Sequence, residues 1–163
     1  MGVQGAVFQK SPLVAEGIKL MRYSMNIYFC GSIAGGRKYL ETYQKIVTYL
    51  KNGGHRVLTD HVVQPDVLES EKKLTPEHIY TRDIAWLNEC DCVAAEVSNP
   101  SLGVGYEVCY ALRIEKPVLC LYRQGIFLTR MLLGNTSEGI RVDEYHDDAG
   151  WQKSIDRFLS TIK

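Results

Sequence analysis

The 163-residue sequence has no excess charge of either sign, because 19 Lys and Arg residues balance 19 Asp and Glu residues. Nucleic acids and anionic membrane surfaces attract proteins with a basic excess, so we expect neither as a partner. The sequence also lacks an apolar run of the roughly 18 residues that a membrane-spanning helix requires. These absences indicate a single globular domain, and the length suffices for a hydrophobic core.

The sequence has no even set of cysteines, since its five thiols cannot all pair within one chain. Cys92 and Cys120 stand in apolar runs, where a free thiol behaves as a small hydrophobic side chain. Cys90 and Cys92 lack the spacing of zinc ligands and have no second Cys or His pair nearby. We therefore predict no disulfide and no metal, and a reducing, cytoplasmic location that in a eukaryote could extend to the nucleus.

Apolar runs and segments of helical period alternate along the chain. We predict strands at residues 27–30, 55–58, 92–97, 117–122 and 139–145. We predict helices at residues 39–50, 75–88, 103–114 and 151–162, with loops or short helices at 62–75 and 127–133. This alternation is typical of an α/β, Rossmann-like (flavodoxin-like) parallel sheet of about five strands with helices on both faces. Residues 1–24 break the pattern and are expected to form an extension, partly disordered or packed at the periphery.

A Gly-rich turn, Asn99 to Glu107, connects the strand predicted at 92–97 to the following helix. The first turn of a helix presents unpaired N–H groups and the positive end of the helix dipole, which suits a phosphate. Ser101 adds a hydroxyl to the same turn. Glu107 is a carboxylate that a simple phosphate-binding loop does not need, so the turn indicates chemistry on a phosphorylated substrate.

The earlier Gly-rich turn, Gly31 to Arg37, has neither common nucleotide-loop pattern. It lacks the Gly-Lys-Ser/Thr of a P-loop, and it does not fit Gly-x-Gly-x-x-Gly. We therefore predict no ATP or dinucleotide site, and no cofactor.

Ligands of parallel sheets bind outside the carboxyl ends of the strands. By this rule, we expect seven residues to share one cleft: Tyr28, Gly31, Ser32, His61, Asp83, Ser101 and Glu107. Two carboxylates in one cleft suit the cleavage of a glycosidic bond.

Each of these residues also has an ordinary structural interpretation. Asp83 could pair with Arg82 on a helix surface, and Glu107 could be a solvated helix charge. Ser101 could be only a helix N-cap, Tyr28 a core aromatic, and His61 a loop residue.

Four segments together resemble the nucleoside 2-deoxyribosyltransferase superfamily: 27–37 (with the break at Ala34), 83–87, 91–97 and 100–107. The resemblance spans about residues 26–135. The resemblance is most specific over 83–107. There the sequence resembles the Rcl-like branch of the superfamily, the 2'-deoxynucleoside 5'-monophosphate N-glycosidases. It implies a deoxyribosyltransferase-like catalytic domain over 25–163. The implied reaction is hydrolysis of the N-glycosidic bond of deoxynucleoside monophosphates to free base and 2-deoxyribose 5-phosphate.

The resemblance also implies residue roles. Glu107 corresponds to the nucleophile that forms a covalent glycosyl-enzyme, Asp83 to the second carboxylate, and Tyr28 to the tyrosine that orients the nucleophile. His61 corresponds to a histidine near the base. The implied phosphate contacts come from Ser101, from backbone amides around Gly31, Gly35 and Gly103, and from Arg37, and the implied substrate site also includes Ser32 and Ile33.

Thr129 stands where the family places a serine that the neighbouring subunit contributes, which implies a homodimer with shared active sites. Gly134-Asn135 resembles the transferases, whose asparagine holds the sugar in a neighbouring site. Ser101 argues for the hydrolase, because the transferases carry an acidic residue there that would repel a phosphate. Ala34 stands where the branch often has arginine. Two alternatives stay open: a nucleoside 2-deoxyribosyltransferase that exchanges bases, and a non-catalytic nucleotide-binding sensor.

Overall fold

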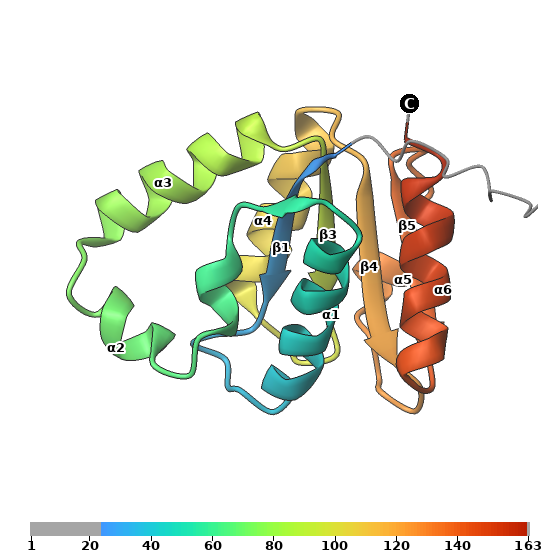
Figure 1. The fold of residues 1–163 in the computed structure, drawn as a ribbon, viewed down its shortest axis with the longest axis horizontal. Coiled ribbons are helices and arrows are strands. Elements are labelled where there is room, and N and C mark those ends of the chain that lie inside the picture. Colours follow the sequence, from blue (N-terminus) through green and yellow to red (C-terminus); the bar gives the residue numbers. More distant parts are fainter. Residues whose placement is uncertain (1–23, 163) are drawn as a thin grey trace, which may run out of the picture.

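The computed structural model describes residues 24–162 (Figure 1). Its sheet has five parallel strands, β1 (Asn26–Gly31), β2 (Arg56–Val57), β3 (Cys92–Glu96), β4 (Val118–Arg123) and β5 (Ile140–Tyr145). The strand order β2-β1-β3-β4-β5 is that of a flavodoxin-like sheet and confirms the predicted fold class. Apart from Ser24, the predicted extension at 1–24 lies outside the described residues.

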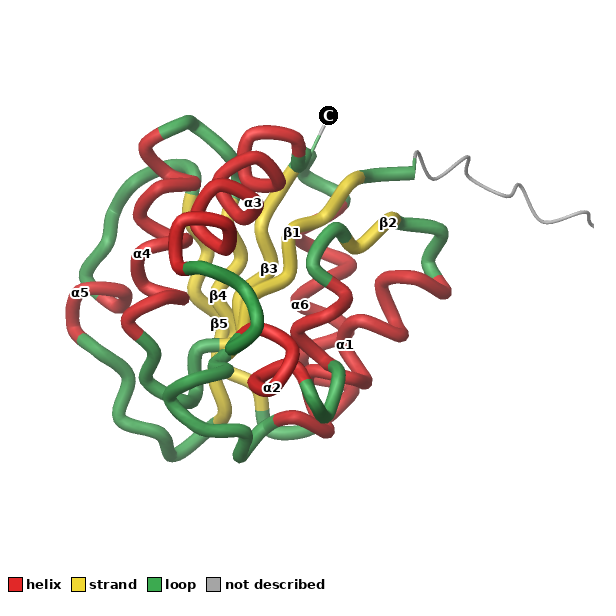
Figure 2. The backbone as a smooth tube through the Cα atoms, turned by 90° about the vertical axis from the view of Figure 1, so that its left-hand side faces the viewer, coloured by secondary structure: helices red, strands yellow, loops and turns green. Residues whose placement is uncertain are grey.

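Helices cover both faces of the sheet (Figure 2). Helices α1 (Leu40–Asn52) and α6 (Asp148–Leu159) lie on one face. Helices α3 (Pro76–Glu89), α4 (Leu102–Arg113) and the short α5 (Arg130–Leu133) lie on the other. Within residues 24–162, none of the helices is both long enough and apolar enough to cross a lipid bilayer.

The strands are buried on both faces, and their side chains alternate between two hydrophobic cores. Ile27 and Phe29 of β1 pack toward α1 and α6. Tyr28 and Cys30 point the other way, toward α4. This alternation puts the polar end of Tyr28 beneath the helix that carries Glu107, although Tyr28 is the third of six residues in β1 rather than near its end.

The second crossover departs most from the sequence prediction. β2 contains only Arg56 and Val57, because the chain turns at once into a 3₁₀ helix, η1 (Asp60–Val63). The short helix α2 (Val67–Glu71) follows and packs on η1. The segment predicted as loop or short helix at 62–75 thus contains the end of η1 and all of α2, and α2 lies near the start of α3 (Figure 1).

The last helix begins three residues before its predicted start. Asp147 caps it, with its carboxylate accepting the N–H of Gly150 at 2.9 Å, so the helix opens at Asp148 rather than Trp151.

Helix α3 directs most of its apolar side chains toward the core. Leu87 is buried, Ile84 and Trp86 pack against the core and are partly exposed, and Ile79 is partly exposed as well. The N-terminal half of α3 extends beyond the sheet (Figure 1). Those half-exposed side chains are therefore available to line a cleft.

We predict that Trp151→Ala destabilises the fold strongly. Trp151 is 1% exposed and packs edge-on against Tyr49, with ring centroids 5.5 Å apart. Its removal should lower the free energy of unfolding by about 3–5 kcal/mol, as measured by urea unfolding. Lys153→Ala, at an exposed position of the same helix, should stay within about 0.5 kcal/mol of the parent. Equal stability of the two variants would contradict the assigned core.

Candidate active site

Glu107 lies in the second turn of α4 and is partly buried. One of its carboxylate oxygens accepts a hydrogen bond from the Tyr28 hydroxyl at 2.6 Å. Tyr28 comes from the middle of the sheet and is 1% exposed. A rigid strand therefore fixes the orientation of a carboxylate at the pocket wall.

The electrostatics of this pair follow from burial. Removal from water and the nearby charge of Asp83 both raise the pKa of Glu107 and the Tyr28 hydrogen bond lowers it, and the net result is a pKa of about 7. Burial, with the charges of Glu107 and Asp83, also raises the pKa of Tyr28 well above its usual range. Tyr28 therefore remains a hydrogen-bond donor, and Glu107 changes charge near neutral pH.

A pocket of about 510 Å³ contains both carboxylates that the sequence analysis singled out, Asp83 and Glu107. Gly103 lines it as well, next to Glu107 on α4. Its other walls come from α2, α3, the loop between them and Tyr106 of α4, and they are largely apolar. They include Leu68, Leu74, Ile79, Tyr80, Ile84 and Tyr106. A mostly apolar pocket with a few convergent polar groups is the usual form of a small-molecule site.

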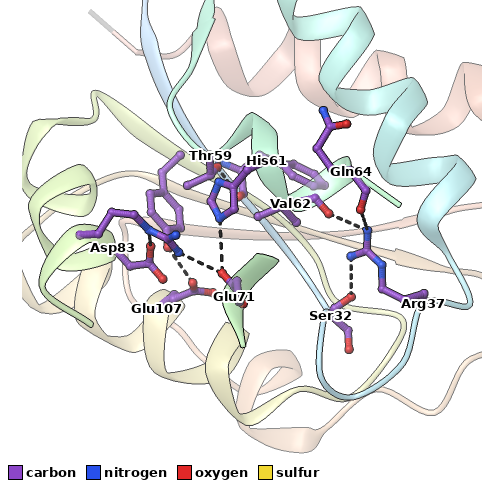
Figure 3. A network of polar contacts seen from close by, with 12 residues as sticks. Ser32, Arg37, Thr59, His61, Val62, Gln64, Glu71, Asp83 and Glu107 are labelled. Atoms are coloured by element: carbon purple, nitrogen blue, oxygen red, sulfur yellow. Dashed lines mark hydrogen bonds and ion pairs between the residues drawn. The ribbon is translucent and has the colours of Figure 1, made fainter. Parts of the chain in front are cut away.

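Asp83 belongs to a chain of polar contacts at the edge of this pocket (Figure 3). Its Oδ1 accepts from Arg82 Nε at 2.8 Å, and Arg82 Nη2 donates to Glu71 Oε1 at 3.0 Å. His61 Nε2 lies 3.6 Å from the same Glu71 oxygen. Burial lowers the pKa of His61, and the charge of Arg82 lowers it further, so the imidazole is neutral at neutral pH.

The loop after β1 and the loop after β3 are clamped together by Asn99. Its side-chain amide donates to the Ser32 hydroxyl and to the carbonyls of Gly35 and Gly36, at 3.0–3.1 Å. A Cβ on Gly35 would lie 2.7 Å from the Pro100 carbonyl oxygen, so only glycine permits this approach. The two loops that the sequence analysis assigned to phosphate binding therefore form one unit.

Other residues of the predicted phosphate site have structural contacts of their own. Ser32 is buried, and its N–H donates to the Tyr43 hydroxyl at 3.2 Å. Gly31 packs on the Tyr43 ring, and Ile33 packs against the core on the α1 face. The Arg37 guanidinium donates to the carbonyls of Ser32, Val62 and Gln64 (Figure 3). Arg37 thus ties the first loop to η1.

Ser101 is the N-cap of α4, and its hydroxyl accepts the N–H of Val104 at 3.4 Å. It lines a second, largely apolar groove of about 740 Å³, on the side of α4 toward α5. Thr129 and Asn135 line this groove too, and neither lines the pocket of Glu107 in its own chain. Three predicted site residues therefore line one cavity and three line another on the opposite side of α4: Ser101, Thr129 and Asn135, and Asp83, Gly103 and Glu107.

Sequence reasoning missed Glu71 and Asn99 as members of the site. Asn99 stands at the start of the Gly-rich run, where an amide that bridges two loops could have been anticipated. Glu71 lies in the aperiodic segment between the second and third strands, and no pattern marked it.

The sequence matches the family described as nucleoside 2-deoxyribosyltransferase over residues 27–145. A relative from Methanococcoides burtonii, named 2'-deoxynucleoside 5'-phosphate N-hydrolase 1, is 47% identical over 118 residues, which are 72% of this chain and 97% of that protein. The 5-hydroxymethyl-dUMP N-hydrolase of Danio rerio is 43% identical over 128 residues, 76% of this chain and 89% of that protein.

Among solved structures, a CMP N-glycosidase of Clostridium botulinum shares the fold, with a TM-score of 0.61 at 16% identity. The match covers 82% of this chain and 98% of that one. The chain therefore belongs to the nucleoside 2-deoxyribosyltransferase family, which confirms the resemblance found in the sequence.

We predict that Tyr28→Phe raises the pKa of Glu107 above its value of about 7, because the hydroxyl stabilises the charged carboxylate. A ¹³C titration of the glutamate side-chain carboxyls measures this, with Glu107→Gln to assign the resonance. The control is Tyr110→Phe. The Tyr110 hydroxyl lies on the same helix as Glu107 but accepts a hydrogen bond from Asn88, so its removal should leave the titration of Glu107 unchanged. An unshifted pKa in Tyr28→Phe would refute the assigned role of the hydrogen bond.

Proposed function

We propose that this protein hydrolyses the N-glycosidic bond of 2'-deoxynucleoside 5'-monophosphates and releases the free base and 2-deoxyribose 5-phosphate. One observation carries the proposal: Glu107, held by Tyr28 at 2.6 Å, faces Asp83 in one pocket beside the glycine-rich start of α4. The names of the relatives support the same reaction class. The 5-hydroxymethyl-dUMP N-hydrolase relative makes a monophosphate with a modified pyrimidine a second candidate substrate.

In the proposed mechanism, the Glu107 carboxylate attacks C1' while the bond from C1' to the base nitrogen breaks. The electron pair of that bond leaves with the base, which takes a proton from Asp83 or from solvent. Water then attacks C1' of the glycosyl-enzyme and frees Glu107, and the proton that the water loses goes to Asp83 or to solvent, whichever supplied the first one. Two displacements at C1' give net retention of configuration. Tyr28 orients Glu107 throughout, and Asp83 binds the sugar.

The 5'-phosphate is proposed to bind at the N-terminus of α4. This N-terminus, with Ser101 as its N-cap, directly follows the loop junction that Asn99 and Gly35 hold together, and it offers N–H groups to an anion. The predicted contacts from Gly31, Ser32, Ile33 and Arg37 belong to this junction or to its support. His61, which lies beside Glu71 instead, is proposed to contact the base. A carboxylate in place of Ser101 would repel the phosphate.

We also propose a homodimer whose active sites are completed across the interface. Leu102, Phe127, Met131 and Leu133 are exposed large apolar residues at or beside the second groove. Thr129 and Asn135 line the same groove, outside the pocket of their own Glu107, which suits residues that serve a neighbouring site. All five cysteines are free, which favours the reducing, cytoplasmic location expected from the sequence.

The reaction test is chromatography of the purified protein with dGMP and with deoxyguanosine, each with and without free adenine. We expect guanine from dGMP alone, unaffected by adenine, and also base release from 5-hydroxymethyl-dUMP. Glu107→Gln should reduce turnover by about a thousandfold or more, because it removes the nucleophile. Deoxyadenosine formed from deoxyguanosine and adenine would identify a transferase, and binding of dGMP without turnover would identify a sensor.

Ser101→Asp separates the phosphate role of this residue from its capping role. Asp caps a helix as well as Ser does, so the fold should be retained. The added negative charge should raise KM for dGMP by about tenfold or more. An unchanged KM would place the phosphate elsewhere.

The dimer is tested by Phe127→Asp with Met131→Asp, which puts two charges on side chains that are 84% and 82% exposed in the single chain. Light scattering should give twice the 18.5 kDa chain mass for the parent and the chain mass for the variant. Lys153→Asp on α6 controls for added negative charge. A monomeric parent would contradict the proposed assembly.

A further inference from the structure

We infer that Arg82, anchored by Glu71, is a positioning residue that fixes Asp83 and balances the negative charge of the pocket. This inference rests on the proposed function and assigns a role to two residues outside the catalytic pair. Three carboxylates, Glu71, Asp83 and Glu107, line one pocket. The arrangement of charge around them is therefore a central physical problem of the site.

The geometry of Arg82 is unusual for its position. Consecutive residues of a helix point about 100° apart, so Arg82 and Asp83 do not face each other by default. Here the Arg82 side chain lies over the ring of Trp86, one turn along, with 5.0 Å from the guanidinium carbon to the ring centroid. In this position, Arg82 Nε donates a hydrogen bond to Asp83 Oδ1 at 2.8 Å.

The far end of the guanidinium is held by a different element. Arg82 Nη2 donates to Glu71 Oε1 at 3.0 Å, and Glu71 is the last residue of α2. The three charged side chains are only 18–21% exposed, so this is not an ordinary surface ion pair. The contact ties the α2 segment to the catalytic carboxylate of α3.

The Arg82 contact leaves Asp83 with one occupied oxygen. Its Oδ1 is bonded to Arg82, whereas its Oδ2 has no hydrogen-bond partner among the described residues. The free oxygen is thus available to a sugar hydroxyl in a fixed orientation. Loss of Arg82 would let the carboxylate rotate and would leave two acidic groups without their cation.

The charges that face Glu107 come from several elements. β1 supplies the Tyr28 hydroxyl and the Cys30 thiol, α3 supplies Asp83, and α2 supplies Glu71. Both acidic residues raise the pKa of Glu107. His61 of η1 is neutral, as described above, and Lys72, which also lines the pocket, pairs with Glu69. Arg82 is thus the cation that contacts two of the three pocket carboxylates within residues 24–162.

The test compares Arg82→Met, Arg82→Lys and Glu71→Gln in steady-state hydrolysis of dGMP across pH. We expect Arg82→Met to lower kcat by about tenfold or more, the scale of one charge-assisted hydrogen bond, with a smaller change in KM. Its acidic limb of kcat/KM should move to higher pH, since Glu107 then gains its proton more readily. Arg82→Lys keeps the charge and should return that limb toward the parent position. Glu71→Gln frees the guanidinium and should lower kcat by a smaller factor.

Arg56→Met is the matched control. Arg56 of β2 forms an exposed ion pair with Glu89 of α3, the helix that carries Arg82, and the N···O distance is 2.9 Å. It should match the parent in kcat and in pH profile. The ¹³C titration of Glu107 measures the same charge effect without turnover, so it tests the inference even if the parent protein hydrolyses no nucleotide. An inactive parent would contradict the proposed function but not the inference about Arg82. Parent-like kcat, pH profile and Glu107 titration in Arg82→Met would overturn the inference and leave the hydrolase intact.

Discussion

The hydrogen bond between Tyr28 and Glu107 joins the centre of the sheet to helix α4, and the site is arranged around it. It requires that β1 direct Tyr28, and not its neighbours, to the α4 face. It also requires that α4 begin close to the end of β3, so that its second turn stands over β1. Because a strand and a helix hold the two partners, the carboxylate is oriented before any ligand arrives.

Helix α4 separates two largely apolar cavities that differ in the polar groups they hold. One contains Glu107 and Asp83, and the other, toward α5, contains Thr129 and Asn135. The N-cap Ser101 and its glycine neighbours stand between them. In the proposed dimer, the same short helix would therefore carry the nucleophile and contact the partner. Substrate binding and assembly would then act on one rigid element.

Much of this arrangement could be predicted from the sequence because it depends on short-range signals and on one topological rule. Short, nearly continuous apolar runs at 27–30, 92–97 and 117–122 indicated buried parallel strands, and Thr75-Pro76 indicated the start of α3. The rule that parallel strands bring their carboxyl ends to one edge placed Asp83 and Glu107 together without knowledge of any side-chain contact.

The remainder could not be predicted because it depends on long-range packing. β2 shrank to two residues and α3 extended beyond the sheet, and neither change has a local signal. Glu71 reaches the site only because η1 and α2 fold back beside α3. The assignment of Thr129 and Asn135 to a separate cavity likewise depends on where α5 packs.

The raised pKa of Glu107 has a consequence for the stability of the whole chain. The folded protein holds this proton up to about pH 7, whereas an unfolded glutamate releases it near its ordinary value of 4.5. Folding therefore takes up a proton between those limits, and the free energy of unfolding falls as pH rises through them, by about 1.4 kcal/mol for each unit of difference that is fully expressed. At the pH where Glu107 is charged and able to react, the free energy of unfolding has been lowered by this whole amount.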